Sequence, residues 1–511
     1  MSDPERRRRE LESFERKALA AGGRARPVAR VFPSDALTPV TLFRRMRASG
    51  EECFLLESVE GGESIARYTF LGCGPSARLS SRDGRIEVED AAGARSPRAE
   101  FLAALDALAV RPGFEPDPDL PPLSSGAVGF LGYDAVRLFE EIPDRHPREG
   151  AIPDALFLKF ESVAAFDHAR QRLLLLTDLA PADAGGAAAA EAAGKASERL
   201  DRLEAFLAAP DPPRPALALG SRPFSARPQA PAGSFLELVG RAQEAIRDGE
   251  AYQIVLSQRW AGPLSIDPFE VYRALRMLNP SPYLFYLETR EASVFGASPE
   301  MLVRCRGRNL ETRPIAGTAR RGATPDEDAA LAKSLLADPK ERAEHVMLVD
   351  LSRNDLGRVS AIGSVRVPRY AAIEKYSHVQ HIVSEVSGEL ASGRRATEAL
   401  AACFPAGTLT GAPKIRAMEL IDDWEPARRG VYGGAVGYLD SAGNLDVAIA
   451  IRTAVVEAGV CRIQAGAGIV ADSVAETEHR ECEAKAEALF SAIRLAEEWA
   501  SESDPAGEAA P

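Results

Sequence analysis

The sequence predicts an α+β protein built on antiparallel sheets. Its strand-like runs follow turn signals and do not alternate strictly with helices, which favours antiparallel pairing over a doubly wound fold. Of the 511 residues, 45% are hydrophobic, which is normal for a chain with a full core. A chain of this length holds two or three average domains or one large one. The sequence has no internal repeat at a fixed period.

The expected elements fall into two halves. In the first half we expect strands at 53–56, 66–71 and 172–177 and a helix at 99–110. In the second half we expect strands at 253–258, 283–287, 293–295, 379–386, 435–438 and 447–455. Turn-forming residues bound these runs, as expected for strands of a sheet.

Residues 180–232 are dominated by Ala, Pro, Gly and Ser and are therefore predicted to be a linker. The Ala-rich part up to residue 208 suits a helix, as LDRLEAFL indicates, whereas the Pro-rich remainder is expected to cross the surface. We therefore divide the chain into an N-terminal region, 1–232, a second region, 233–495, and a disordered tail, 496–511.

Composition excludes several function classes. The formal charge of -13, with no clustered basic face, argues against a nucleic-acid binder. The one strong basic run, 6–9, is followed at once by Glu10 and Glu12. No apolar run approaches the ~20 residues that span a bilayer, and the N-terminus lacks the apolar core of a signal peptide. We therefore expect a cytoplasmic protein with no nucleic-acid or membrane partner.

Common catalytic signatures are missing as well. The six cysteines show no CxxC or CxxxC spacing and no zinc-like His partner, which indicates core residues in a reducing compartment. The sequence has no Ser nucleophile elbow, P-loop or dinucleotide GxGxxG. ATP and NAD chemistry are therefore not expected.

The most informative segment, 460–493, places charges where charges are costly. A strand-like run leads to glycines at 466–468, expected to form a turn, and then to a helix. At about 100° per residue, Glu478, Glu481 and Lys485 share an arc of roughly 60° beside an apolar stripe. Groups at such a buried edge are paired, hydrogen-bonded or bound to metal.

A second helix repeats this arrangement. Asp338 is expected to cap it and Pro339 to start it, and Glu341 and Glu344 then lead into an apolar stripe. Four glutamates from two helices offer the hard oxygen ligands that Mg²⁺ prefers and leave positions for water and substrate oxygens. Glutamates three residues apart also occur in solvated segments of the chain. The support for a metal site therefore comes from the position of these glutamates beside the apolar stripe, and not from their spacing.

The second half also contains polar or glycine-rich stretches: GASPE at 296–300, TRPIAGTARRG at 312–322, FPAGTLTGAPK at 404–414 and RRGVYGGAVGY at 428–438. Such loops present backbone donors and Thr hydroxyls to anions. With the glutamate helices they resemble the chorismate-utilising enzymes, and the set is similar to component I of the anthranilate synthases. The resemblance covers residues 253–485, with a weaker extension through LLES at 55–58 and RYTFLG at 67–72.

The resemblance implies large antiparallel sheets packed as a sandwich with helices outside, and it makes 233–495 the chorismate-binding catalytic region. It implies a Mg²⁺-dependent lyase of tryptophan biosynthesis. The ring hydroxyl of chorismate is replaced by an amino group from ammonia, and pyruvate is then eliminated to give anthranilate. The implied metal ligands are Glu344 and Glu481, with Glu341 and Glu478 close behind.

The resemblance also supplies catalytic and substrate-binding candidates. Glu300 is the expected acid for departure of the hydroxyl, and its pKa would have to be raised by burial. His381 is the expected base for the ring proton, because it alternates with Val379 and Val383 on one face of a strand whereas His378 lies on the other. Thr408 is the third catalytic candidate. The substrate-binding candidates are Gly317, Thr318, Tyr432, Arg452, Gly466, Ala467, Gly468 and Lys485.

Two positions separate the chain from related enzymes. Ala316 stands where enzymes similar to aminodeoxychorismate synthase carry a lysine that attacks chorismate covalently. Gln253 stands where isochorismate and salicylate synthases carry a lysine thought to activate water. A neutral amide is no general base, so the incoming nucleophile should need no deprotonation, and ammonia fits.

The resemblance also implies a partner and an effector. No cysteine lies in a glutaminase-like setting, so a separate glutamine amidotransferase subunit would deliver ammonia, in a heterotetramer of two large and two small subunits. LLES and NPSPYLFYL resemble the site for tryptophan as a feedback inhibitor. The implied effector residues are Glu57, Ser58, Pro282, Tyr283 and Leu284; the Asn-Pro and Ser-Pro pairs beside them are also ordinary turn formers.

Two alternatives stay open at this point. An aminodeoxyisochorismate synthase of a phenazine-type pathway would share the ammonia chemistry and stop before pyruvate loss. A catalytically silent effector-binding or scaffold protein would use the acidic helices as structural ion pairs. Product identity separates the first from an anthranilate synthase, and failure to bind Mg²⁺ or chorismate would favour the second.

Overall fold

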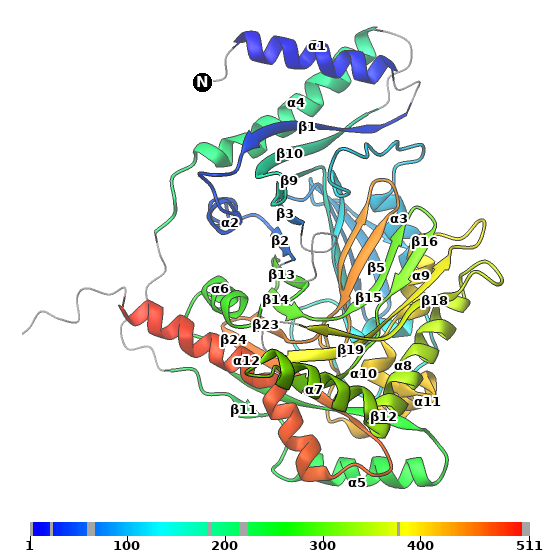
Figure 1. The fold of residues 1–511 in the computed structure, drawn as a ribbon. Helices are drawn as coiled ribbons and strands as arrows, with labels where there is room; N and C mark the ends of the chain where they lie inside the picture. The colour runs from blue at the N-terminus through cyan, green and yellow to red at the C-terminus, as the bar shows by residue number, and fades with distance from the viewer. Residues whose placement is uncertain are drawn as a thin grey trace, which may run out of the picture.

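The computed structural model describes residues 4–20, 24–58, 67–180, 186–213, 223–375 and 379–502. Within these ranges, two antiparallel sheets of twelve strands each pack face to face, and helices cover their outer sides (Figure 1). The predicted α+β sandwich with helices outside is therefore confirmed.

Both sheets draw strands from both halves of the chain. The first has the order β1 (Arg26–Pro33), β10 (Arg172–Leu179), β9 (Ser162–Asp167), β3 (Tyr68–Cys73), β2 (Cys53–Glu57), β13 (Tyr283–Glu288), β14 (Ser293–Ser298), β23 (Thr453–Glu457), β24 (Val460–Ile469), β12 (Gln253–Pro263) and β11 (Arg227–Pro228), with β20 (Gly411–Ala412) also on β12. The second has the order β17 (Ile315–Arg320), β19 (Val379–Glu389), β16 (Asn309–Thr312), β15 (Met301–Arg306), β22 (Leu445–Ile449), β21 (Ala435–Asp440), β7 (Gly126–Leu131), β8 (Ala155–Phe160), β4 (Ala77–Arg82), β5 (Arg85–Asp90) and β6 (Arg95–Arg98), with β18 (Arg366–Lys375) also on β19. The division at residue 232 stays a prediction about domains, and strands from both of its sides interleave here.

The helices form two outer layers. The first sheet is covered by α1 (Pro4–Ala20), α2 (Pro39–Arg47), α4 (Gly186–Ala208), α5 (Ser234–Arg247), α6 (Pro268–Leu278) and α12 (Ala475–Glu502). The second sheet is covered by α3 (Phe101–Ala109), the 3₁₀ helix η1 (Tyr133–Leu138), α7 (Pro325–Ala337), α8 (Pro339–Gly357) and α9 (Ala396–Cys403). Two further helices, α10 (Gly407–Thr410) and α11 (Lys414–Trp424), pack against the core of the second sheet and also contact β12 of the first. None of the described helices is long and apolar enough to cross a bilayer.

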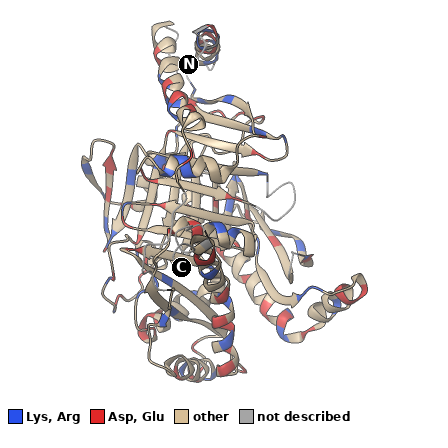
Figure 2. Ribbon diagram, turned by 90° about the vertical axis from the view of Figure 1, so that its left-hand side faces the viewer, with Lys and Arg blue, Asp and Glu red and all other residues tan. Residues whose placement is uncertain are grey.

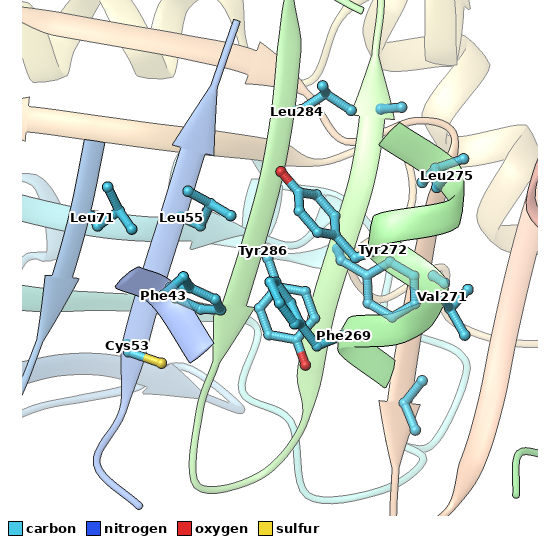
Figure 3. Close-up of a cluster of buried hydrophobic side chains, with 14 of the residues drawn as sticks. Phe43, Cys53, Leu55, Leu71, Phe269, Val271, Tyr272, Leu275, Leu284 and Tyr286 are labelled. Carbon is cyan, nitrogen blue, oxygen red and sulfur yellow. The ribbon is translucent and has the colours of Figure 1, made fainter. Parts of the chain in front are cut away.

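Three apolar layers hold the sandwich together: one lies between the sheets and one on the outer side of each sheet. Between the sheets, Phe54 and Phe285 of the first meet Phe130 and Phe160 of the second, and Phe54 and Phe160 pack edge to face at 4.7 Å. Outside the first sheet, Phe43 of α2 packs with the α6 aromatics and β13, as Figure 3 shows. Charged residues lie mainly outside these layers, where acidic and basic residues are interspersed (Figure 2). Burial on this scale stabilises the sandwich by roughly 25 cal/mol per Å² of apolar surface.

Most predicted elements are present, with two corrections in the second half. The strand predicted at 447–455 is two strands, β22 and β23, because Arg452 turns the chain with φ 51°. The tail predicted to be disordered from residue 496 starts too early. Helix α12 continues to Glu502, since Ala496 and Ala500 are buried and Trp499 packs against the same core.

Part of the segment predicted to be a linker, 180–232, forms regular structure. Its Ala-rich part forms α4, whose small side chains, such as Ala193 and Ala196, are fully buried. Residues 181–185 and 214–222 lie outside the described residues, as do 376–378, which include the His378 that was compared with His381.

Candidate active site

Glu300 and Thr408 meet between β14 and α10. Glu300 follows β14 and is 8% exposed, and its backbone carbonyl accepts a hydrogen bond from the Ile449 N–H at the end of β22. The Thr408 hydroxyl donates to the Glu300 carboxyl oxygens at 3.4 and 3.5 Å. Burial raises the pKa of Glu300 to about 8, although the Thr408 hydroxyl and the Lys485 charge act the other way. Glu300 is therefore mostly protonated at neutral pH and able to donate a proton.

His381 lies opposite Thr318 in the β17–β19 ladder. Its Nδ1–H donates to the Gly317 carbonyl oxygen at 2.9 Å, and the Thr318 hydroxyl lies 3.1 Å from the same nitrogen. Because a carbonyl only accepts, the neutral ring carries its lone pair on Nε2. Burial, helped by the Arg452 charge, lowers the pKa of His381, so the ring is neutral at pH 7. A neutral imidazole of this tautomer can accept a proton.

Gly317 is a glycine for a structural reason. It sits at a register shift in β17 with φ 63°, a conformation that side chains rarely adopt. A Cβ there would also lie 2.9 Å from Glu341 Oε2. The site therefore brings the β17 backbone directly against the first glutamate of α8.

Arg452 provides a cation between the two sheets. Its backbone carbonyl accepts from Ala297, which ties it to the strand that leads to Glu300. Burial lowers the pKa of the Arg452 guanidinium, with Tyr432 and Glu481 as its electrostatic neighbours. Among the residues that the structure describes, no hydrogen bond or ion pair occupies this guanidinium, so its planar fork is open to a carboxylate.

The glycine stretch is strand, not turn, which corrects the expectation for 466–468. Gly466 and Gly468 lie within β24, opposite Ser257 and Val255 of β12. A Cβ on Gly466 would lie 2.7 Å from the Tyr432 hydroxyl, and the Lys485 Nζ donates to the Gly466 carbonyl at 2.8 Å. These glycines therefore make room for neighbouring side chains along the strand.

Ala467 points away from this face. It is fully buried in the core beneath α12, because successive side chains of a strand alternate. Only its backbone is then available to a ligand, and the predicted contact would have to use that backbone.

The four glutamates lie near the N-terminal ends of α8 and α12, where Glu481 is an electrostatic neighbour of Glu341, Glu344 and Glu478. Asp338 caps α8 through the Lys340 and Glu341 N–H groups, as predicted. Burial first, and then the neighbouring carboxylates, raise the pKa values of Glu344 and Glu478. The pKa of Glu341 rises for the same reasons. This mutual repulsion marks an excess of negative charge.

The prediction that Glu481 lies at a buried edge of the helix is wrong. Glu478 is 5% exposed, whereas the Glu481 side chain is 47% exposed and ion-paired with Lys485 at 2.7 Å. Three residues of helix turn through about 300°, which rotates Glu481 about 60° from Glu478 toward solvent. In the described part of the chain, no group of three or more His, Cys, Asp or Glu side chains is already gathered as a metal site.

Gln253 and Ala316 occupy the two positions at which related enzymes were said to carry a lysine. Ala316 is buried in β17 and presents only a methyl group. Gln253 is 4% exposed and its Oε1 is buried without a hydrogen-bond partner, while its Nε2 would lie 2.5 Å from a Cβ on Gly468. Because an unsatisfied buried acceptor is costly, Gln253 Oε1 is suited to accept a hydrogen bond from a small donor that binds beside it.

All five predicted effector residues line one cavity of about 600 Å³ between the sheets. Its walls hold Glu57, Ser58, Pro282, Tyr283 and Leu284. The Tyr272 hydroxyl and the Arg276 guanidinium donate to Glu57 Oε2 at 2.7 and 2.8 Å. Glu57 Oε1 and the Ser58 hydroxyl are buried without hydrogen-bond partners. The cavity has the size of a small-molecule site.

Sequence reasoning missed other residues around these sites. Arg304 and Asp446 line the same cavity and are bonded to each other at 2.9 Å. Arg429 lies fully buried next to Tyr432. It stands within the RRGVYGGAVGY stretch, where nothing in the pattern distinguished it from the arginine before it. A further cavity, of about 620 Å³, is lined by Trp260 and Trp424 and by none of the predicted site residues.

The sequence matches the family described as chorismate binding enzyme over residues 51–491. The chain therefore belongs to this enzyme family. The candidate site residues and every strand of both sheets except β1 lie within the matched range.

Relatives named anthranilate synthase component 1 match nearly the whole chain. The protein from Mycobacterium tuberculosis is 45% identical over 493 residues, which cover 94% of this chain and 95% of that one. The protein from Thermus thermophilus is 46% identical over 476 residues, with coverage of 93% and 99%. The crystal structure of anthranilate synthase component I from Streptococcus pneumoniae aligns with a TM-score of 0.73 at 35% identity, covering 90% of this chain and 99% of that one. Within the family, the chain thus groups with the component 1 proteins.

Proposed function

We propose that this chain is the large subunit of an anthranilate synthase, which converts chorismate and ammonia to anthranilate and pyruvate. One observation carries the proposal: Glu300, a buried carboxyl that keeps its proton, and His381, a neutral imidazole, have Lys485 and Arg452 as their respective electrostatic neighbours. Both of these cations in turn neighbour Glu481. The reaction needs both an acid and a base. The open guanidinium of Arg452, a neighbour of His381, suits a substrate carboxylate.

In the first stage the ring hydroxyl is replaced. Glu300 donates its proton to the hydroxyl, which leaves as water, and the nitrogen of ammonia bonds to the ring. Arg452 and the Tyr432 hydroxyl hold the enolpyruvyl carboxylate, and Lys485 adds positive charge from α12. Ammonia needs no base to deprotonate it, which agrees with the neutral Gln253 at the nucleophile end of the site.

In the second stage the ring becomes aromatic. His381 Nε2 accepts the proton from the ring carbon while the bond between the ring and the enolpyruvyl oxygen breaks. The enolpyruvyl group leaves and takes up a proton to become pyruvate, and anthranilate remains. The bond from Nδ1–H to the Gly317 carbonyl keeps the imidazole in the required tautomer.

The carboxylates of α8 and α12 fit Mg²⁺ as the cofactor, because their raised pKa values report negative charge that a divalent cation would offset. Glu344 and Glu481 would hold the ion, with Glu341 and Glu478 behind them. When bound, Mg²⁺ supplies a Lewis acid and a template for the ring carboxylate.

The variant Glu344→Gln tests this assignment. We expect the rate at a fixed Mg²⁺ concentration to fall by at least about 10²-fold, since even a change to a residue behind the metal ligands typically costs 10- to 100-fold. We also expect Mg²⁺ to raise the unfolding temperature of the wild type and not of the variant. Rate and thermal unfolding are measured across a Mg²⁺ titration. Glu476→Gln, on the exposed face of α12, is the control, and an unchanged Mg²⁺ response in Glu344→Gln would contradict the assignment.

We also propose that the cavity of about 600 Å³ binds tryptophan as a feedback inhibitor. The unpartnered Glu57 Oε1 and Ser58 hydroxyl suit the ammonium of an amino acid, and the apolar walls suit an indole. Since strands of both sheets line the cavity, an occupant would bias how the sheets pack and thereby the affinity for substrate.

The variant Ser58→Ala is expected to keep the uninhibited rate within about twofold and to need at least about tenfold more tryptophan for half-inhibition. A hydrogen bond to a charged group contributes about 1.5–3 kcal/mol, which is tenfold or more in affinity. Inhibition curves measure the effect. Ser49→Ala, outside the cavity, is the control, and full tryptophan sensitivity of Ser58→Ala would refute the effector assignment.

A glutamine amidotransferase subunit is proposed as the source of ammonia in a heterotetramer with two copies of each chain, because component 1 names one part of a two-component enzyme. A cytoplasmic location belongs to the same proposal, and the six cysteines are all free thiols.

The proposal is tested without the partner. Purified chain, chorismate, Mg²⁺ and excess ammonium at mildly alkaline pH are expected to develop anthranilate fluorescence, which EDTA abolishes. No chorismate consumption at all would instead support a silent scaffold protein.

A further inference from the structure

Arg429, three residues before Tyr432, is a buried guanidinium whose hydrogen bonds join separate parts of the site. Its side chain is 1% exposed. Nε and Nη2 donate to the Glu425 carboxylate at 2.8 and 2.6 Å. Nη1 donates to the Leu409 carbonyl and Nη2 to the Val255 carbonyl, both at 2.7 Å. Four of the five guanidinium N–H groups are thus used.

These contacts reach the groups that face the substrate. Leu409 follows Thr408 in α10, so its bond to Arg429 holds the helical turn that directs the Thr408 hydroxyl at Glu300. The Arg429 guanidinium also lies over the Tyr432 ring, 5.8 Å from its centroid. The Tyr432 hydroxyl in turn lies beside Gly466 of β24.

Arg429 also has close contacts on the side away from Tyr432, with Tyr133 and Glu425. The guanidinium lies 4.6 Å from the centroid of Tyr133 in η1. The Glu425 carboxylate that pairs with it is 4% exposed and also accepts from the backbone N–H and the hydroxyl of Ser257, both at 2.8 Å. A buried ion pair is weak evidence for stability, because desolvation offsets its attraction. Geometric control of the surrounding elements is the better explanation.

We propose that Arg429 is a positioning residue that holds Tyr432 and the Thr408 turn in register with the substrate. The inference rests on the proposed function, because that function gives Tyr432 and Thr408 their roles. Lysine cannot replace this arginine, since an ammonium is a compact charge without the planar fork that serves these acceptors and stacks on two rings.

The test compares Arg429→Lys with Arg428→Lys under the anthranilate assay. Arg428 is the adjacent arginine and bonds Asp144 and the His146 carbonyl, away from Tyr432 and Leu409. For Arg429→Lys we expect kcat/KM to fall by about 10- to 100-fold with a raised KM for chorismate, because a small misplacement of binding groups has effects of that size. Arg428→Lys should match the wild type.

A second readout separates positioning from general damage. The Thr408 hydroxyl lowers the pKa of Glu300, so a released Thr408 turn moves the alkaline limb of the kcat–pH profile to higher pH. Arg429→Lys should show this shift in the same direction as Thr408→Val. If Arg429→Lys does not fold, Glu425→Gln, which loosens the same guanidinium, should show the raised KM and the shifted limb in weaker form.

The outcomes are distinguishable. A wild type that makes no anthranilate overturns the proposed function itself. A wild type that makes anthranilate, together with an unchanged KM and an unchanged pH profile in the folded Arg429→Lys or Glu425→Gln variant, overturns the positioning role alone.

Discussion

Glu300→Gln is expected to lower kcat by about 10³-fold, because a positioned general acid contributes about 10²- to 10⁴-fold. The amide keeps the shape of the side chain and can still accept from Thr408, yet it has no proton to give to the departing hydroxyl. In the wild type, kcat should fall as the pH rises through about 8, where Glu300 loses its proton. Steady-state rates from pH 6 to 10 measure both effects.

Stability should respond to Glu300→Gln in the opposite direction to activity. The pKa of Glu300 is about 8 in the folded chain against 4.5 for an ordinary glutamate. Neutral Glu300 therefore contributes stability that is complete below pH 4.5 and lost as the pH rises toward 8. Above that pH the wild type buries a charge that the variant lacks, so Glu300→Gln should unfold at a higher temperature at pH 9.

The control for this prediction is Glu385→Gln, a half-buried carboxylate on β19. It should leave both the rate and the alkaline limb unchanged. Near wild-type kcat in Glu300→Gln would show that Glu300 is not the acid.

His381→Ala is expected to uncouple the two stages. Amination uses Glu300 and not the imidazole, so chorismate should still be consumed, whereas aromatisation should slow by about 10²- to 10⁴-fold without the base. An aminated ring that still carries its enolpyruvyl group should then accumulate. Chromatography of the quenched reaction, with separate quantification of chorismate, this intermediate and anthranilate, measures the effect.

The control for the imidazole is His146→Ala, whose ring bonds a backbone carbonyl of the α11 helix outside the site. It should form anthranilate at the wild-type rate. Equal loss of amination and aromatisation in His381→Ala would point to a collapsed site, and undiminished anthranilate formation would contradict the role of the base.

The fold class was predictable because turn signals and strand runs reflect local chemistry. The strand order was not, since β14 and β23 pair across a separation of more than 150 residues and no local pattern records such a partner. The split of 447–455 into two strands depends on the positive φ of Arg452, a residue type that rarely adopts it. Local propensity therefore favoured one strand.

For the site, helix periodicity was enough to predict that Glu341 and Glu344 lie on one face of α8 and that Glu478, Glu481 and Lys485 share an arc of α12. Periodicity could not establish that Glu481 turns to solvent, because exposure depends on what packs beside α12. The glycines at 466–468 suggested a turn, and only the ladder with β12 explains them as space for Tyr432 and Gln253. The Arg429 contacts come from three separate segments and left no spacing to detect.

The central claim, that this chain completes both amination and elimination, is tested most directly by stoichiometry. Purified wild type is given chorismate, Mg²⁺ and ammonium, and chorismate loss, pyruvate and anthranilate are quantified in the same samples. The proposed function predicts one pyruvate and one anthranilate for each chorismate consumed. Loss of chorismate with an aminated product and no pyruvate would contradict it and favour an aminodeoxyisochorismate synthase.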